Sequence, residues 1–136
     1  MAYVNLIVLL ALFQFLYFTF KVGLGRGKYG VKAPACEGND QFDRLFRIQQ
    51  NTLEQMIIMI PASYLFAHYL SEQWVLVPGV VYLLGRFLYS REYLTDPDSR
   101  TPGMAMTLLA NVSLLIGGLI GVGMSLAQGM AMTVSG

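Results

Sequence analysis

The sequence from Thr101 to Gly136 reads TPGMAMTLLANVSLLIGGLIGVGMSLAQGMAMTVSG and contains no Asp, Glu, Lys or Arg. A helix needs about 20 apolar residues to cross the hydrocarbon core of a bilayer, so this segment is long enough for a crossing. Thr101 followed by Pro102 is typical of an N-cap and the first residue of a helix. We therefore predict a membrane protein whose last helix is capped by Thr101.

The composition of the whole chain agrees with a membrane location. Of its 136 residues, 55% are hydrophobic and 12% are charged, and the mean hydropathy is +0.53. Soluble domains carry about twice that share of charge. One Cys and one His exclude a disulfide framework and a Cys/His metal cluster, so we expect no metal. The net charge of +1 gives no electrostatic basis for nucleic-acid binding, so we expect no nucleic-acid partner.

Three further stretches are predicted to be membrane spans, of which the third is short and must borrow length from the aromatic residues that follow it. The first runs from Met1 through Val22 and lacks the basic N-terminal residues of a secretory signal peptide. The second runs from Phe42 to Ser71, and the third begins near Gln73 and continues past Arg86. The expected fold is therefore an all-α, integral-membrane four-helix bundle that forms one domain over residues 1–136.

The connections between the spans carry the basic residues. Gly23 to Gln41 is rich in glycine and is predicted to be a loop, and Asp96 to Ser99 is predicted to be a turn. All nine Lys and Arg fall in or beside these two connections. By the positive-inside rule, both connections face the cytoplasm and both termini lie on the other side. In a bacterium, this membrane would be the inner one.

Polar side chains follow one face of the second span and one face of the third. Counted at about 100° per residue, four of them keep to an arc of about 80° on the second span: Arg44, Arg47, Asn51 and Glu54. Four on the third span keep to about 60°: Tyr82, Arg86, Tyr89 and Tyr93. Because charge near the membrane is costly unless it is paired or hydrated, we expect these stripes to face each other or a neighbouring subunit. The alternative is a purely structural role as interfacial ion pairs and an aromatic belt.

The residues of these two stripes resemble the motifs of a known family. Phe42 to Glu54 reads FDRLFRIQQNTLE and resembles F-[ED]-R-x-[FY]-R-x-Q-x-N-x-x-E, the signature of the MAPEG superfamily (membrane-associated proteins in eicosanoid and glutathione metabolism). Tyr82 to Tyr93 reads YLLGRFLYSREY and is similar to the pattern Y-x-x-x-R-x-x-Y-x-x-x-Y of the third helix in that family. The resemblance covers nearly the whole chain and indicates a bacterial member of the microsomal glutathione transferase and leukotriene-C synthase type.

The resemblance implies a homotrimer that binds glutathione, as a co-substrate, at the cytoplasmic end between neighbouring subunits. It assigns the glutathione contacts of one subunit to Arg47, Asn51, Glu54, Tyr89 and Tyr93. The adjacent subunit would supply Arg26 and Gln49. Arg100 matches the arginine that faces the thiol and is the first catalytic candidate. Tyr89 is the second, as a hydrogen-bond donor to the thiolate.

The chemistry of thiols agrees with these roles. A guanidinium beside a thiol lowers its pKa because the positive charge favours the thiolate, and arginine stays charged where a desolvated lysine does not. The expected reaction is attack by the glutathione thiolate on a lipophilic electrophile or a lipid hydroperoxide that arrives from the membrane lipid. Gln55 stands where eicosanoid-conjugating members carry an aromatic residue, and the one tryptophan, Trp74, lies near the outer turn. We therefore expect a broader transferase or peroxidase rather than a leukotriene synthase.

Two other functions compete with this interpretation. One is a non-enzymatic lipid-binding protein of the same family, but members of that kind lack the arginines that match Arg47 and Arg100. The other is a small four-helix exporter, which would need an acidic residue in the first span. The segment from Met1 to Phe20 has none.

Overall fold

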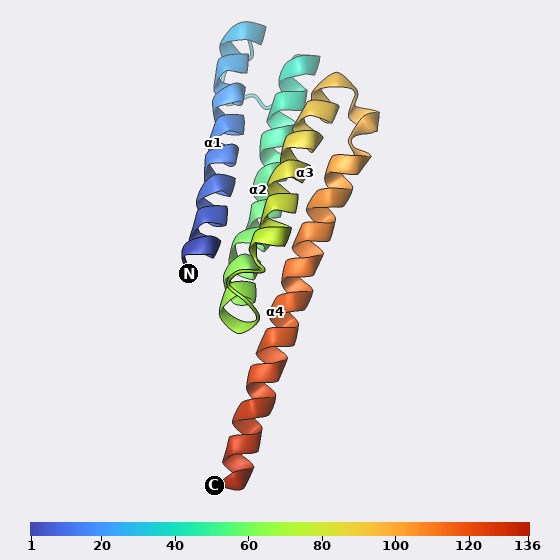
Figure 1. The fold of residues 1–136 in the computed structure, drawn as a ribbon. Helices are drawn as coiled ribbons and strands as arrows, with labels where there is room; N and C mark the ends of the chain where they lie inside the picture. Colours follow the sequence, from blue (N-terminus) through green and yellow to red (C-terminus); the bar gives the residue numbers. More distant parts are fainter.

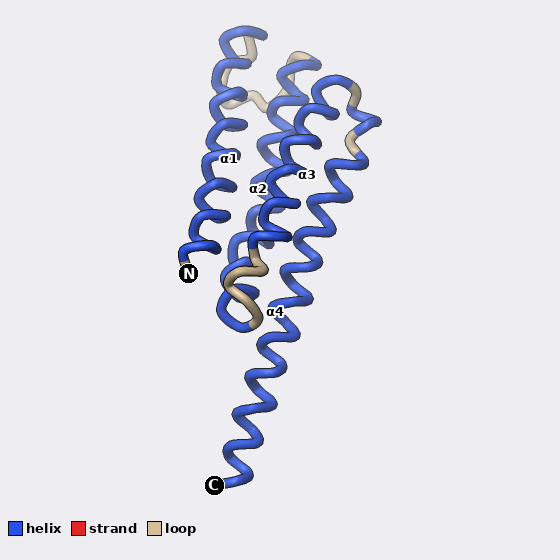
Figure 2. Tube along the Cα trace, in the orientation of Figure 1, coloured by secondary structure: helices blue, strands red, loops and turns tan.

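The computed structural model describes residues 1–136 and consists of four helices with short connections (Figure 1). The elements are α1 (Ala2–Tyr29), α2 (Asp40–Tyr69), α3 (Leu76–Thr95), a 3-10 turn η1 (Pro97–Ser99) and α4 (Thr101–Ser135). Figure 2 shows that every ordered element is helical. Both termini point toward the end of the bundle that holds the α2–α3 turn (Figure 1). The predicted all-α four-helix bundle is confirmed.

The first helix extends further than its glycines suggest. The prediction of a loop from Gly23 to Gln41 is wrong for its first part, because α1 continues to Tyr29. Gly25 is buried, and a Cβ atom there would lie 2.9 Å from the Cδ1 atom of Leu45, so glycine lets α1 approach α2 closely. This packing outweighs the poor helix propensity of glycine. The helix ends where Gly30 adopts a left-handed conformation with φ of 70°.

The starts of α2 and α4 are set by two different local arrangements. Asn39 caps α2, because its side-chain oxygen accepts hydrogen bonds from the backbone N–H groups of Gln41 and Phe42. The predicted cap of α4 is wrong: Arg100 is the cap residue, and Thr101 is already helical. The reason is that η1 feeds directly into α4, which leaves Arg100 with helical backbone angles of −70° and −9°.

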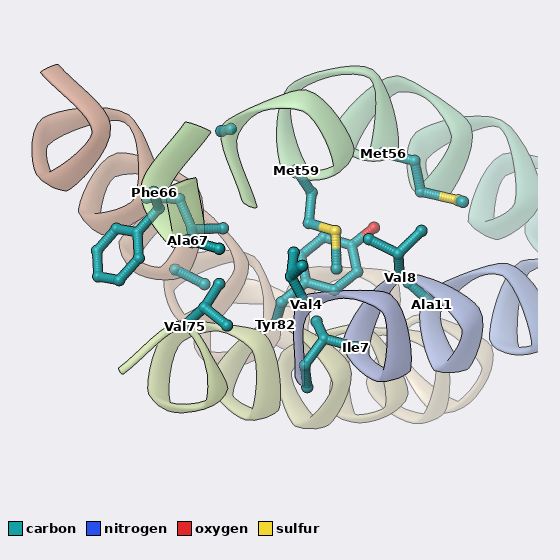
Figure 3. Packing of buried hydrophobic residues seen from close by; sticks show 13 residues of the cluster. Val4, Ile7, Val8, Ala11, Met56, Met59, Phe66, Ala67, Val75 and Tyr82 are labelled. Carbon is teal, nitrogen blue, oxygen red and sulfur yellow. The ribbon is translucent and has the colours of Figure 1, made fainter. Parts of the chain in front are cut away.

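The centre of the bundle is an apolar cluster to which all four helices contribute. In Figure 3, Val4, Ile7 and Val8 of α1 lie with Met59 of α2 and Tyr82 of α3. All of these side chains are buried. Their packing holds α1 against the α2–α3 pair and fixes the positions of the polar residues nearer the other end of the bundle.

Small residues bring α4 close to α2. A Cβ atom on Gly117 would clash with the ring of Phe66, and one on Gly121 would clash with the backbone of Tyr69. Such small residues are the usual means by which membrane helices approach each other. From Gly123 to its end the helix is exposed and projects beyond the bundle (Figure 1). Only α1 and the segment Pro97–Ser135 are individually long and apolar enough to cross a membrane.

Candidate functional site

A buried arginine joins three helices near the middle of the two polar stripes. Arg86 of α3 has no exposed surface, and its Nη1 donates a hydrogen bond of 2.7 Å to Oδ1 of Asn51 in α2. Its Nη2 donates to the sulfur of Met104 in α4 at 3.7 Å. Arg86 forms no salt bridge. The stripes on α2 and α3 therefore face each other, as the sequence predicts.

A column of two stacked tyrosine rings between two guanidinium groups begins at Arg86 and leads to the surface. The Cζ atom of Arg86 lies 4.3 Å from the centre of the Tyr89 ring. The rings of Tyr89 and Tyr93 stack, with their centres 5.6 Å apart and their planes inclined by 23°. The Cζ atom of Arg100 lies 5.8 Å from the centre of the Tyr93 ring. This cation–aromatic column places the exposed Arg100 at the open end of a row whose other end is buried.

The polar face of α2 offers both signs of charge and an amide. Nη1 of Arg47 and Oε1 of Glu54 are 3.9 Å apart, and both side chains are 55% exposed. Asn51 lies between them on the same face and is buried. The side-chain oxygen of Asn51 accepts the hydrogen bond from Arg86. Its amide nitrogen forms no hydrogen bond within the chain and is free to donate to a ligand. A ligand with carboxylate and ammonium groups would find a partner for each.

Arg26 and Gln49 have different neighbours. Nη1 of Arg26 donates to the carbonyl oxygen of Ala35 at 2.7 Å, and its Cζ atom lies 5.1 Å from the ring centre of Phe42. Nε2 of Gln49 donates to the hydroxyl of Thr19 at 3.1 Å. Neither side chain forms a hydrogen bond or an ion pair with the other candidate residues. At about 100° per residue, Gln49 points roughly 160° away from Arg47 around α2, so one chain alone does not bring the two sets together.

Comparison with known proteins places the chain in a family. The model of the MAPEG family matches residues 4–120. The chain belongs to the MAPEG family. It is similar to an uncharacterized protein of Synechocystis sp., with 39% identity over 90% of each chain. Human microsomal glutathione S-transferase 2 is 34% identical over 78% of this chain and 72% of its own length. A probable microsomal glutathione S-transferase of Dictyostelium discoideum is 32% identical over 79% of this chain and 75% of its own.

MAPEG membership confirms the resemblance inferred from the two motifs. Together with the two long apolar helical segments, it makes this chain a membrane protein. The family match includes the cation–aromatic column and the polar face of α2, since both lie within residues 4–120. The individual site residues rest on the geometry described above and stay a prediction.

The sequence pattern places Arg86 of this MAPEG chain on the polar stripe of α3 but assigns it no role. A guanidinium near the middle of a membrane span is costly unless it has partners, and this cost is the signal that marks Arg86 as a central residue. Gln55 also has a role that the sequence left open. Nδ2 of Asn111 donates to Oε1 of Gln55 at 3.0 Å, so Gln55 connects α2 to α4.

An apolar groove opens beside the column, between α2 and α4. Its volume is about 310 Å³, and it is lined by Gln55 of α2 and by Thr101, Met104, Ala105 and Leu108 of α4. Met104 also accepts the hydrogen bond from Arg86, and Thr101 directly follows Arg100 in the chain. The groove therefore adjoins the guanidinium of Arg86 through Met104 and begins beside the first turn of α4, next to Arg100 in the chain.

Proposed function

We propose that this MAPEG protein is a glutathione-dependent membrane transferase that uses glutathione as a co-substrate. The observation that carries the proposal is the cation–aromatic column ending at Arg100, next to the α2 face that presents Arg47, Asn51 and Glu54. The names of two relatives, both glutathione S-transferases, support the same substrate. Peroxidase action on lipid hydroperoxides is a second activity open to the same thiolate.

The polar groups match those of glutathione, which carries two carboxylates, one ammonium group and two amides. Arg47 suits a carboxylate because its guanidinium can bind both oxygens, and Glu54 suits the ammonium group. The free amide nitrogen of Asn51 and the hydroxyl of Tyr93 add neutral hydrogen-bond donors. Arg26 and Gln49 would come from the adjacent subunit of a homotrimer, because they point away from the other candidates within one chain.

The proposed reaction begins with loss of the proton from the glutathione thiol to solvent. The guanidinium of Arg100 stabilises the thiolate, and the Tyr89 hydroxyl would add a hydrogen bond to it. A sulfur lone pair attacks the electrophilic carbon, a carbon–sulfur bond forms, and the leaving group departs with its bonding electrons. With a hydroperoxide, the thiolate attacks oxygen instead. A sulfur–oxygen bond forms as the O–O bond breaks, and the departing alkoxide takes a proton from solvent to give the alcohol. A second glutathione then converts the sulfenic acid to a disulfide and water.

The second substrate would enter from the bilayer through the groove between α2 and α4. Its apolar part would lie against Met104 and Leu108, with the reactive atom toward Arg100. By the positive-inside rule, the basic residues at this end of the bundle support a cytoplasmic location for it, and both termini would lie on the other side. Glutathione would thus arrive from the cytoplasm, and the inner membrane would be the location in a bacterium.

The proposal is tested with the full chain purified in detergent. We expect glutathione binding by titration calorimetry and conjugation of glutathione to a generic aryl halide. Arg47→Ala should weaken glutathione binding, whereas Lys32→Ala, which removes the same charge from an exposed loop position, should not. Binding of lipid without any binding or turnover of glutathione would replace the proposal by a non-enzymatic lipid-binding function.

A further inference from the structure

A groove lies between α1 and α3, and it is formed by two adjoining cavities. The outer cavity has a volume of about 510 Å³ and the inner one about 190 Å³. Lys21, Leu45 and Leu94 line both, so the cavities are continuous. Lys28 lines only the outer cavity, and Arg91 lines only the inner one.

This groove is separate from the candidate glutathione site. At about 100° per residue, the mean direction of Leu45 and Ile48 lies roughly 110° from the mean direction of Arg47 and Asn51 around α2. On α1, Lys21 points roughly 140° away from Arg26, the residue proposed to serve a neighbouring subunit. The groove therefore opens away from Arg47, Asn51 and Arg26. Gln49, at about 40° from Leu45 by the same count, is the candidate contact that points nearest to it.

Three cations around the groove lack anionic partners. Lys21, Lys28 and Arg91 form no salt bridge, and their side chains donate no hydrogen bond within the chain. Two basic residues near this end differ, since Arg44 is paired with Asp40 and Arg47 with Glu54. Three exposed positive charges around one groove, none of them paired with a carboxylate, favour a negatively charged occupant.

The position of the groove along the bundle selects the kind of anion. From Ala2 to Phe20, α1 carries no charge, and at 1.5 Å per residue this stretch is about 28 Å long, close to the hydrocarbon thickness of a bilayer. Lys21 therefore lies at the level of the lipid headgroups. Arg91 lies at the same level because it lines the same cavity. Farther along that cavity the lining includes Phe18, Ile48 and Phe87, which suit an acyl chain.

We propose that this groove binds one anionic phospholipid of the surrounding membrane, with its phosphate between Lys21 and Arg91. Lys28 would reach the polar part of the headgroup, and one acyl chain would lie along Ile48 and Phe87. Long basic side chains at the end of a span extend toward headgroups in this way. A zwitterionic lipid places its own cation near the three basic residues and should bind more weakly.

Native mass spectrometry of the full-length protein tests this directly. The protein is equilibrated in detergent with equimolar phosphatidylglycerol and phosphatidylcholine, and the lipids that stay bound are counted. The wild type should retain phosphatidylglycerol preferentially. Lys21→Gln and Arg91→Gln should each reduce that retention, and the double variant should reduce it about tenfold or more. Lys32→Gln, the matched control outside the groove, should leave it unchanged.

Further variants distinguish charge from shape and from the proposed enzyme function. Lys21→Arg should retain the lipid, because it keeps the positive charge. Glutathione binding should be the same in all these variants, so that failure of the lipid site and failure of the glutathione site are separate results. Equal retention of the two lipids by the wild type, or a preference for phosphatidylglycerol that survives the double variant, would overturn the proposal. Absence of any bound phospholipid, as expected if a protein surface fills the groove, would overturn it as well.

Discussion

The guanidinium of Arg86 and the amide of Asn51 form a hydrogen bond of 2.7 Å inside the bundle, and no carboxylate is paired with that arginine. The positive charge is instead balanced by dipoles and by the face of the Tyr89 ring. The hydroxyl of Thr52, 3.5 Å from the same nitrogen, is a weaker partner. Asn51 is therefore a candidate contact for glutathione and also the closest hydrogen-bond acceptor for the buried guanidinium of Arg86.

The first prediction concerns the stability of this pair. Asn51→Leu should lower the free energy of unfolding by about 3 kcal/mol, because it leaves a buried charge without its best acceptor. The double variant Arg86→Met/Asn51→Leu should be more stable than Asn51→Leu alone, since it removes the unsupported charge together with its partner. Thermal and denaturant unfolding in detergent measure both effects. If the two substitutions only add, the two side chains are not coupled.

The number and type of the helices could be predicted because charge is scarce in this chain. No charged residue occurs from Thr101 onward, and Lys21 is the only one before Val22. Two uncharged stretches of this length predict membrane-spanning helices. The helical spacing of Arg44, Arg47, Asn51 and Glu54 then indicated where the polar face of α2 lies. The contact between the two stripes followed from the cost of exposing charge to lipid, and the bond between Arg86 and Asn51 confirms it.

Other features depend on tertiary contacts that local sequence patterns do not show. Glycine has a low helix propensity, so the sequence from Gly23 onward predicts a loop. The helical state of Gly25 is favoured only because Leu45 of α2 lies against it. The cap of α4 was misplaced because the backbone of Arg100 is set by the preceding turn. The central place of Arg86 becomes clear only when α2 and α4 supply its partners.

The second prediction compares two glycines of α4. A Cβ atom on Gly121 would lie 2.6 Å from the carbonyl carbon of Tyr69, whereas one on Gly123 would meet nothing within 4 Å. Gly121→Ala should therefore lower the free energy of unfolding by about 1–3 kcal/mol through overpacking. Gly123→Ala should leave it unchanged or raise it by up to about 1 kcal/mol, because alanine favours the helix. Equal unfolding temperatures for the two variants would contradict the close contact between α2 and α4.

The third prediction separates structure from ligand binding at Gln55. Gln55→Leu removes Oε1, the acceptor 3.0 Å from Nδ2 of Asn111, and leaves that buried amide nitrogen only a 3.5 Å contact with the backbone carbonyl oxygen of residue 55. The free energy of unfolding should fall by about 1–3 kcal/mol. Affinity for glutathione, measured by calorimetry at a temperature where the variant is folded, should stay the same. A large loss of affinity without a loss of stability would instead make Gln55 a glutathione contact.

The fourth prediction concerns the activating residue. Glutathione bound to the wild type should show the ultraviolet absorption of a thiolate at neutral pH, and Arg100→Ala should abolish it. The rate of conjugation should fall about 100-fold, which corresponds to a loss of about 2.7 kcal/mol of transition-state stabilisation. Glutathione should still bind, because Arg47 and Glu54 are unchanged. If the thiolate signal persists in Arg100→Ala, the role belongs to another residue, and Arg47→Ala and Tyr89→Phe would be measured next.

The fifth prediction asks whether one site is shared between two subunits. Arg47→Ala and Arg26→Ala should each abolish activity when present in every subunit of the proposed trimer. A cyclic trimer has heterologous interfaces, so each proposed site takes Arg47 from one subunit and Arg26 from its neighbour. In mixed trimers assembled from equal amounts of the two variants, about a quarter of the sites would therefore contain both arginines intact. Activity should return to about that level.

A site built within one subunit gives a different result. Each chain of the mixture would then carry one defective residue in its own site, and no activity would return. Mixing Arg47→Ala protein with itself, taken through the same dissociation and reassembly, controls for recovery caused by the procedure. The mass of the complex in detergent must also equal three chains. A monomer or dimer would rule out the arrangement in which Arg26 and Gln49, turned away from Arg47 in a single chain, complete the site of a neighbour.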